Sequence, residues 1–315
     1  EEAAVAAARD RSAERRCAAL CVLAMLRTPS ALGVALAASK DEDSRVRMAA
    51  VECLDRIGTR AALLVLVSRL GDEQRLRVRW RIVEVLQAAS GLKNRLDPRP
   101  WKLWAEQLPS DGPPKLSAAP SRPRGAADAD HTEAGGFVGL SPRSARVCFL
   151  FDFSGSMWTA LEDGRVPKDI VAAKLTEALE ELPETTEFNL IPFTNEPLPW
   201  EPELRPAKKN EVRRALDYFL GCRARGRGNF FDAALLAMSD PRVDTIVVLT
   251  DGVPTGGVHS DMDLITPLLL ERTRFRKLVV DSILVDAPGY IANRWHELSR
   301  LTGGRSTEVE LAATK

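Results

Sequence analysis

Two short acidic turns, each directly after an apolar run, carry the residues that could do chemistry in this chain. The first turn holds Asp152, Ser154 and Ser156 in the pattern Asp-x-Ser-x-Ser, and the second begins with Asp251. Carboxylate, hydroxyl and water oxygens are the ligands that hard divalent cations such as Mg²⁺ prefer. The two turns together therefore predict a site for a divalent cation.

Both turns follow runs that are expected to be buried strands, at 145–152 and 243–250. Open α/β sheets bind ligands at the carboxyl ends of their strands, so two parallel strands can bring Asp152 and Asp251 to one cation. Simpler explanations remain for each turn. The serines could cap the start of a helix, and Asp251 with Gly252 could form an ordinary turn.

Together the two stretches resemble the metal-ion-dependent adhesion site of von Willebrand factor A (vWA) domains. In that family the first Asp and both Ser lie in the first loop, a Thr comes from a middle loop, and a second Asp follows the fourth strand. The two Asp and two Ser named above match this pattern, and residues 249–255 are typical of the family's later motif. The resemblance covers roughly residues 136–311 and implies an α/β fold with a doubly wound, mostly parallel, Rossmann-like sheet.

The middle loop departs from the family pattern. Residues 226–235 align with the family's Gly-Gly-Thr-Asn region, and Gly228 stands where the Thr ligand is expected. Asn229 could turn its side-chain oxygen toward the cation, water could replace the missing hydroxyl, or Asn229 could only cap the helix expected from Phe230. We therefore expect Mg²⁺ or Mn²⁺ to bind weakly.

The C-terminal region alternates between strands and helices, which favours a mostly parallel sheet covered on both faces. The strand at 277–285 should be interior, with Asp281 and Ser282 as strand residues and not metal ligands. The expected strands are 145–152, 187–193, 198–200, 243–250, 277–285 and 305–310, and the expected helices are 166–182, 206–220, 231–239, 260–273 and 290–301.

The N-terminal region carries Ala, Leu, Val and Arg at helical spacing and shows no strand-like alternation. Its segments around Arg16, Arg47 and Arg79 align at offsets of 31 and 32 residues. A two-helix unit repeated at this period is typical of an α-solenoid and resembles HEAT repeats, with a non-repetitive helical bundle as the alternative. We expect some arginines near Arg79 to bond to a neighbouring repeat or its acidic loop.

These patterns predict three parts: HEAT-like repeats at 1–108, a flexible linker at 109–135 and a vWA domain at 136–315. The linker is rich in Pro, Ala, Ser, Asp and Gly and has few large apolar residues. The apolar residues Phe137 and Val138 should dock on the C-terminal domain.

Composition argues against several other classes of protein. The chain has 44 Lys and Arg against 44 Asp and Glu, so no net charge attracts it to nucleic acid or to a membrane surface. No apolar run reaches the roughly 18 residues of a membrane span. The five cysteines form no Cys-x-x-Cys pair, which slightly favours the cytoplasm without fixing the localisation. The sequence begins at Glu1 without Met, so a native N-terminal segment or signal peptide could be missing.

Three functions fit these observations. The resemblance, which extends to bacterial proteins that join HEAT-like repeats to a vWA domain, implies a non-enzymatic protein-interaction module. Its partner would supply an acidic residue to the cation, and the repeat surface would bind protein as well. The second is a Mg²⁺-dependent phosphatase of the haloacid dehalogenase type, but that chemistry needs an acid where Ser154 stands, because the second acid protonates the leaving group. The third is an accessory subunit of an AAA+ ATPase chaperone system.

Overall fold

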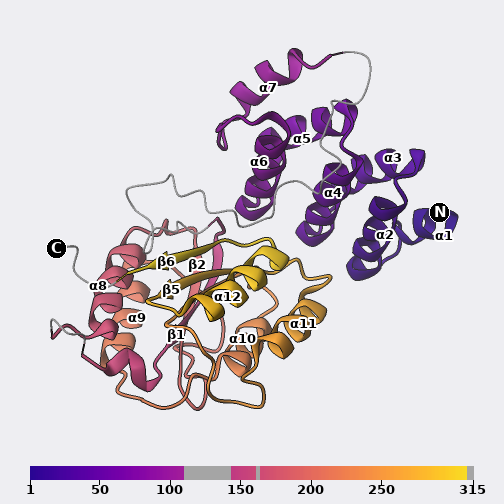
Figure 1. Cartoon of the computed structure of the whole chain (residues 1–315). Coiled ribbons are helices and arrows are strands. Elements are labelled where there is room, and N and C mark those ends of the chain that lie inside the picture. Colours follow the sequence, from indigo (N-terminus) through magenta and orange to yellow (C-terminus); the bar gives the residue numbers. More distant parts are fainter. Residues whose placement is uncertain (110–142, 161–163, 311–315) are drawn as a thin grey trace. The chain divides into compact units, whose positions relative to one another are not determined.

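The computed structural model describes residues 1–109, 143–160 and 164–310, which fall into an all-helical unit and an α/β unit (Figure 1). The predicted linker, apart from Pro109, lies outside the described residues, and so do Phe137 and Val138.

The helical unit is built from repeated pairs of helices around one apolar core. The three segments aligned by sequence become helices α2, α4 and α6, and α4 packs against both of the others. The predicted α-solenoid is therefore formed by the described helices. Their bounds are α1 Glu2–Ala7, α2 Ala13–Leu26, α3 Pro29–Ala38, α4 Ser44–Ile57, α5 Arg60–Asp72, α6 Leu76–Ser90 and α7 Pro98–Glu106.

Equivalent arginines in the first two repeats bond to the loop that begins the next repeat. Arg16 donates two hydrogen bonds to the carboxylate of Asp41, each 2.8 Å long. Arg47 donates to the carboxylate of Glu73 at 2.7 and 2.9 Å. Two parallel hydrogen bonds fix the geometry of each pair and so stabilise the stacking of successive repeats.

The third repeat keeps the arginine but not the acid. Arg79 donates to the backbone oxygen of Leu96, 3.0 Å away, at the start of the segment that leads into α7. In the same helix Arg81 is buried and pairs with Asp55 of the preceding repeat at 2.9 Å. The expectation that arginines near Arg79 bond to a neighbouring repeat is confirmed.

The α/β unit contains a six-stranded sheet in the order β3-β2-β1-β4-β5-β6. The pairs β1–β2, β1–β4, β4–β5 and β5–β6 are parallel, and β3 is antiparallel to β2. The chain starts in the middle of the sheet, builds to one edge and then returns to build the other, as predicted for a doubly wound sheet. The strands are β1 Arg146–Asp152, β2 Glu187–Phe193, β3 Arg205–Pro206, β4 Thr245–Thr250, β5 Val279–Val285 and β6 Ser306–Val309.

Helices cover both faces of this sheet (Figure 1). Phe149 and Phe151 of β1 pack in the cluster that includes α8 and α9, whereas Cys148 and Leu150 pack in the cluster that includes α10, α11 and α12. This alternation explains why β1 is apolar throughout. The helices are η1 Gly155–Trp158 (a 3₁₀ turn), α8 Pro167–Glu180, α9 Lys209–Gly221, α10 Phe230–Ser239, α11 Met262–Thr273 and α12 Gly289–Thr302.

The prediction of a strand at 198–200 is wrong. The backbone N–H groups of Leu198 and Trp200 do donate to carbonyl oxygens of β2, each at 2.8 Å. However, β2 donates nothing back: Pro192 has no N–H group, and the N–H of Leu190 donates to the side chain of Asn189 at 2.8 Å, so no regular ladder forms there. The antiparallel neighbour of β2 is instead the two-residue strand β3.

The expected interior strand is confirmed as β5, between β4 and β6, although it begins at Val279 and not at 277. Asp281 is buried in it and accepts a bond of 3.0 Å from the guanidinium of Arg305. Ser282 is fully buried and lies 2.6 Å from the hydroxyl of Ser306. Both are therefore strand residues with structural partners, as the sequence predicts.

Candidate metal site

Two parallel neighbouring strands position the two predicted acids at one edge of the sheet. Strand β1 ends at Asp152, and β4 ends at Thr250, directly before Asp251. The register pairs Phe151 with Leu249, so both strands end at the same level. The two acids therefore lie where the strand order reverses, the place at which open α/β sheets bind ligands.

Hydrogen bonds join the four predicted ligands in one network. The backbone N–H of Ser154 donates to Oδ1 of Asp152 at 2.8 Å, and the hydroxyls of Ser154 and Ser156 lie 3.1 Å apart. Ser156 in turn hydrogen-bonds to the carboxylate of Asp251. The structure thus brings together Asp152, Ser154, Ser156 and Asp251.

Within the described stretches of the chain, no positive side chain compensates the two carboxylates of this network. Burial, and then the negative charge of Asp251, raises the pKa of Asp152 to about 6. Burial also raises the pKa of Asp251, against the hydrogen bond from Ser156. Within the described residues, neither acid forms an ion pair with Lys, Arg or His. A divalent cation would supply the missing compensation.

Gly228 of the middle loop lies directly against Asp152. A Cβ atom added to Gly228 would be 3.2 Å from Oδ2 and 3.4 Å from Oδ1 of this carboxylate. The φ angle of Gly228 is not in the left-handed region, so the backbone accommodates a side chain there. The middle loop therefore reaches the site where the resemblance implies a Thr ligand, but it brings no hydroxyl.

Asn229 caps helix α10. Its side-chain oxygen accepts from the N–H of Asp232 at 3.3 Å, and its side-chain nitrogen donates to the backbone oxygen of Asn195 at 2.9 Å and to the Asp232 carboxylate at 2.8 Å. Both ends of the amide are engaged in these bonds. The structure therefore shows the capping alternative for Asn229.

Two threonines at the site were not among the predicted residues. The hydroxyl of Thr250 donates to Oδ2 of Asp152 at 2.7 Å, and the hydroxyl of Thr255 accepts from the N–H of Gly228 at 2.9 Å. The signal for Thr250 was its position at the end of β4, one step beyond the residue that pairs with Phe151. Thr255 could not be found in this way, because a loop folds it back against Gly228.

The available ligands suit a hard cation that keeps several waters. In the stretches 1–109, 143–160 and 164–310, no group of three or more His, Cys, Asp or Glu side chains could hold a metal ion. Two carboxylates with hydroxyl oxygens fit Mg²⁺ or Mn²⁺ better than Zn²⁺, which prefers nitrogen and sulfur ligands. Asp152 is 2% exposed but Ser156 is exposed, so the network runs from the buried strand end to the surface. An outside carboxylate could therefore reach a cation bound here.

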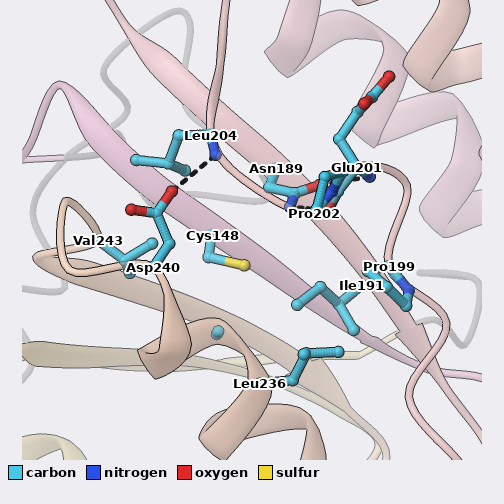
Figure 2. Close-up of a pocket in the computed structure, with 11 residues that line it drawn as sticks. Cys148, Asn189, Ile191, Pro199, Glu201, Pro202, Leu204, Leu236, Asp240 and Val243 are labelled. Atoms are coloured by element: carbon cyan, nitrogen blue, oxygen red, sulfur yellow. Dashed lines mark hydrogen bonds between the residues drawn. The ribbon is translucent and has the colours of Figure 1, made fainter.

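A small cavity toward the amino-terminal halves of β1 and β2 is not a second candidate (Figure 2). Its volume is about 30 Å³, and Cys148, Asn189, Ile191 and Asp240 are among its lining residues. This volume holds about one water molecule, far below the hundreds of Å³ of a small-molecule site. The cavity is therefore a minor packing defect.

Comparison with known proteins found matches to both halves of the chain. A family model described as HEAT repeats matches residues 1–87. The C-terminal half is similar to the inter-alpha-trypsin inhibitor heavy chain H4 of Homo sapiens, with 34% identity over 131 residues, and to that of Bos taurus, with 33% over 137 residues. These matches cover 38% and 40% of this chain, but only 13% and 14% of the relatives. It is also similar to the human von Willebrand factor A domain-containing protein 3B, with 25% identity over 160 residues, half of this chain and 11% of that protein.

Solved structures of vWA domains resemble the same half. A von Willebrand factor type A protein from Catenulispora acidiphila aligns at 16% identity with a TM-score of 0.41, covering 52% of this chain and 38% of that one. The SpRpn10 VWA domain aligns at 13% identity with a TM-score of 0.40, covering 53% and 89%.

The chain thus carries HEAT repeats at its N-terminus and a vWA-type α/β domain in its C-terminal half. Among the described helices, none is long and apolar enough to cross a membrane. This combination of domains fits a protein-interaction module.

Proposed function

We propose that the vWA-type domain binds a protein partner through a divalent cation. Asp152, Ser154, Ser156 and Asp251 would hold Mg²⁺ or Mn²⁺ at the carboxyl edge of the sheet. Bound there, the cation supplies an open coordination position. An acidic side chain of the partner would fill it, because the attraction of the cation offsets the cost of removing a carboxylate from water.

One observation carries this proposal: the buried carboxylate of Asp152 and the half-buried carboxylate of Asp251 lie in one hydroxyl-linked network and have no positive partner among the described residues. A structural role would favour the opposite arrangement, since buried charges are normally paired. The cost of burying both acids is explained if a cation enters the site.

The affinity for the cation should be low. Gly228 supplies no hydroxyl, Asn229 is engaged in capping, and the Asp152 carboxylate already accepts a bond from Thr250. Water therefore stands in for the Thr ligand. We further propose that the surface of the HEAT repeats provides a second protein-binding face, as expected for stacked helical repeats.

A carboxylate probe tests the proposed function. A fluorescent peptide with one Asp among Ser residues should bind the full chain in Mg²⁺ and not in EDTA, as measured by fluorescence anisotropy. Asp152→Ala should abolish the binding in Mg²⁺. Asp217→Asn is the matched control, because Asp217 is an exposed acid on α9 outside the network, and it should bind like the wild type. Binding that is equal in Mg²⁺ and EDTA would contradict the proposal.

A further inference from the structure

The loop between α9 and α10 presents three arginines on one side. Residues 222–229 are neither helix nor regular strand, and exposure alternates along the first half of this loop. Arg223, Arg225 and Arg227 are exposed, whereas the residues between them are half-buried. Alternation of this kind is typical of an extended segment, in which every second side chain points to the same side.

This loop lies alongside the proposed cation site. The backbone oxygen of Gly226 accepts from the N–H of Gly155 at 3.2 Å, so the loop runs beside the turn that carries both serines. The guanidinium of Arg225 lies 4.4 Å from the ring centre of Trp158, in the 3₁₀ turn η1 that also contains Ser156. The arginine is therefore held near the exposed end of the hydroxyl network.

Arg227 lies against the loop that follows β4. Gly256, in the loop after β4, packs so closely on it that an added Cβ would be 2.8 Å from Cβ of Arg227. Arg225 and Arg227 are the sequence neighbours of Gly226, which lies beside the first loop. The next residue, Gly228, lies against the Asp152 carboxylate.

In the part of the chain that the structure describes, no acidic side chain neutralises these arginines. Within the described residues, Arg223, Arg225 and Arg227 form no ion pair with Asp or Glu. Arg223 donates only to the backbone oxygen of Leu220, and Arg225 lies over the Trp158 ring. The guanidinium groups remain available to a partner, and their charge would accelerate the approach of an anionic one.

Two large side chains are exposed on the other segments at this edge of the sheet. Val258, which follows a glycine packed on Asn229, is 79% exposed, and Tyr290, at the start of α12, is 69% exposed. Arg, Tyr and apolar side chains together are typical of protein interfaces. A polyanionic sugar would use the arginines but not Val258, so these side chains favour a peptide.

Building on the proposed function, we propose that the partner presents an extended acidic segment with carboxylates at alternate positions. One carboxylate occupies the cation, and the next ones pair with Arg225 and Arg227. Alternate residues of an extended chain lie about 7 Å apart on the same side, and this spacing applies to both the loop and the segment that docks along it. The cation gives the anchor, and the arginines select a partner with more than one acid.

Two labelled peptides test this inference on the full chain in Mg²⁺. One has three Asp at alternate positions between Ser residues, and the other is the same peptide with one Asp. The wild type should bind the tri-acidic peptide about tenfold more tightly, because each partly exposed arginine–carboxylate pair contributes about threefold. The double variant Arg225→Ala/Arg227→Ala should lose most of this difference but keep its affinity for the mono-acidic peptide.

Arg213→Ala is the matched control. Arg213 is exposed on α9, about 12 Å along the helix axis from its C-terminal end, and it should keep the full tenfold preference. Equal binding of the two peptides by the wild type would overturn this inference while leaving the cation site intact. A preference that survives in the double variant would also overturn it. Failure of the mono-acidic peptide to bind in Mg²⁺ would instead contradict the proposed function.

A sulfated oligosaccharide of similar charge completes the test. If it binds more tightly than the tri-acidic peptide and loses affinity in the double variant, the loop recognises anionic sugars and the assignment to an acidic peptide is wrong. Weaker binding than the tri-acidic peptide supports the assignment.

Discussion

The two halves of the chain use buried carboxylates in opposite ways. In the helical repeats, Glu73 is buried but accepts two bonds from Arg47, and although burial alone would raise its pKa, these bonds and a backbone N–H lower it. In the vWA-type domain, Asp152 is also buried, but burial and the negative charge of Asp251 raise its pKa to about 6.

This difference separates structural acids from binding acids. The repeat carboxylates are fully compensated inside the chain, so their ionised form stabilises the stacking of the helices. The carboxylates at the sheet edge have no positive partner among the residues that the structure describes, so their ionised form destabilises the domain until a cation binds. Removing one acid from each half should therefore have effects of opposite sign.

The largest effect is expected for Glu73→Gln. Removing this charge leaves the guanidinium of Arg47, whose side chain is 13% exposed, without its ionic partner. We expect the helical unit to lose about 3 kcal/mol of its free energy of unfolding. Native-state hydrogen exchange of α4 and α6 measures this loss within the full chain.

Asp72→Asn is the control for this change. Asp72 pairs with Arg69 at 3.2 Å but is 68% exposed, so its loss should alter the same exchange rates by less than about 0.5 kcal/mol. Equal effects of the two substitutions would contradict the view that Glu73 holds adjacent repeats together.

The next effect is expected for Asp152→Asn, with the opposite sign. In EDTA near neutral pH, the neutral amide keeps partners for Ser154 and Thr250 but removes the repulsion with Asp251. A pKa raised from 3.8 to about 6 corresponds to about 2–3 kcal/mol, so the metal-free domain should become more stable by up to this amount.

The pH dependence gives the same prediction in another form. Between about pH 4 and pH 6 the folded domain holds the proton of Asp152 and the unfolded chain does not, so the free energy of unfolding should fall as the pH rises through this window. Hydrogen exchange of β1 and β4 should show a steeper slope in the wild type than in Asp152→Asn, in which only Asp251 keeps a raised pKa. The same slope in both proteins would contradict the assignment.

The smallest effect is expected at Gly228. Gly228→Thr places a hydroxyl beside the Asp152 carboxylate, and its Cβ is tight at 3.2 Å but not excluded by the backbone angle. We expect Mn²⁺ to bind several-fold more tightly, as a further ligand replaces water. Gly228→Ala adds the Cβ without the hydroxyl and should not tighten binding; a similar gain in both variants would show that the hydroxyl is not the cause.

Much of this architecture could be predicted because its signals are local. The apolar strands that end in Asp152 and before Asp251 placed both acids at one edge, and the 31- and 32-residue offsets revealed the helical repeats. The prediction of a strand at 198–200 failed because β2 cannot return the hydrogen bonds of such a strand: Pro192 has no N–H group, and the N–H of Leu190 is taken by Asn189.

The remaining features depend on contacts across the fold. The contact of Thr255 with Gly228 joins two loops that are 27 residues apart in the sequence. Whether Arg225 and Arg227 form ion pairs depends on which acids the fold places around them. The sequence therefore shows the arginines but not whether they are free to bind a partner. The difference between Glu73 and Asp152 has the same origin, since both are acids beside apolar runs.

Titration calorimetry with Mn²⁺ tests most directly whether a cation compensates Asp152 and Asp251. The wild-type chain should bind one Mn²⁺ weakly at this site, and Asp152→Ala should remove that binding while the domain stays folded. Mn²⁺ binding that is unchanged in Asp152→Ala, or absent from the wild type and from Gly228→Thr alike, would contradict the account and leave these two uncompensated acids without a cation to explain them.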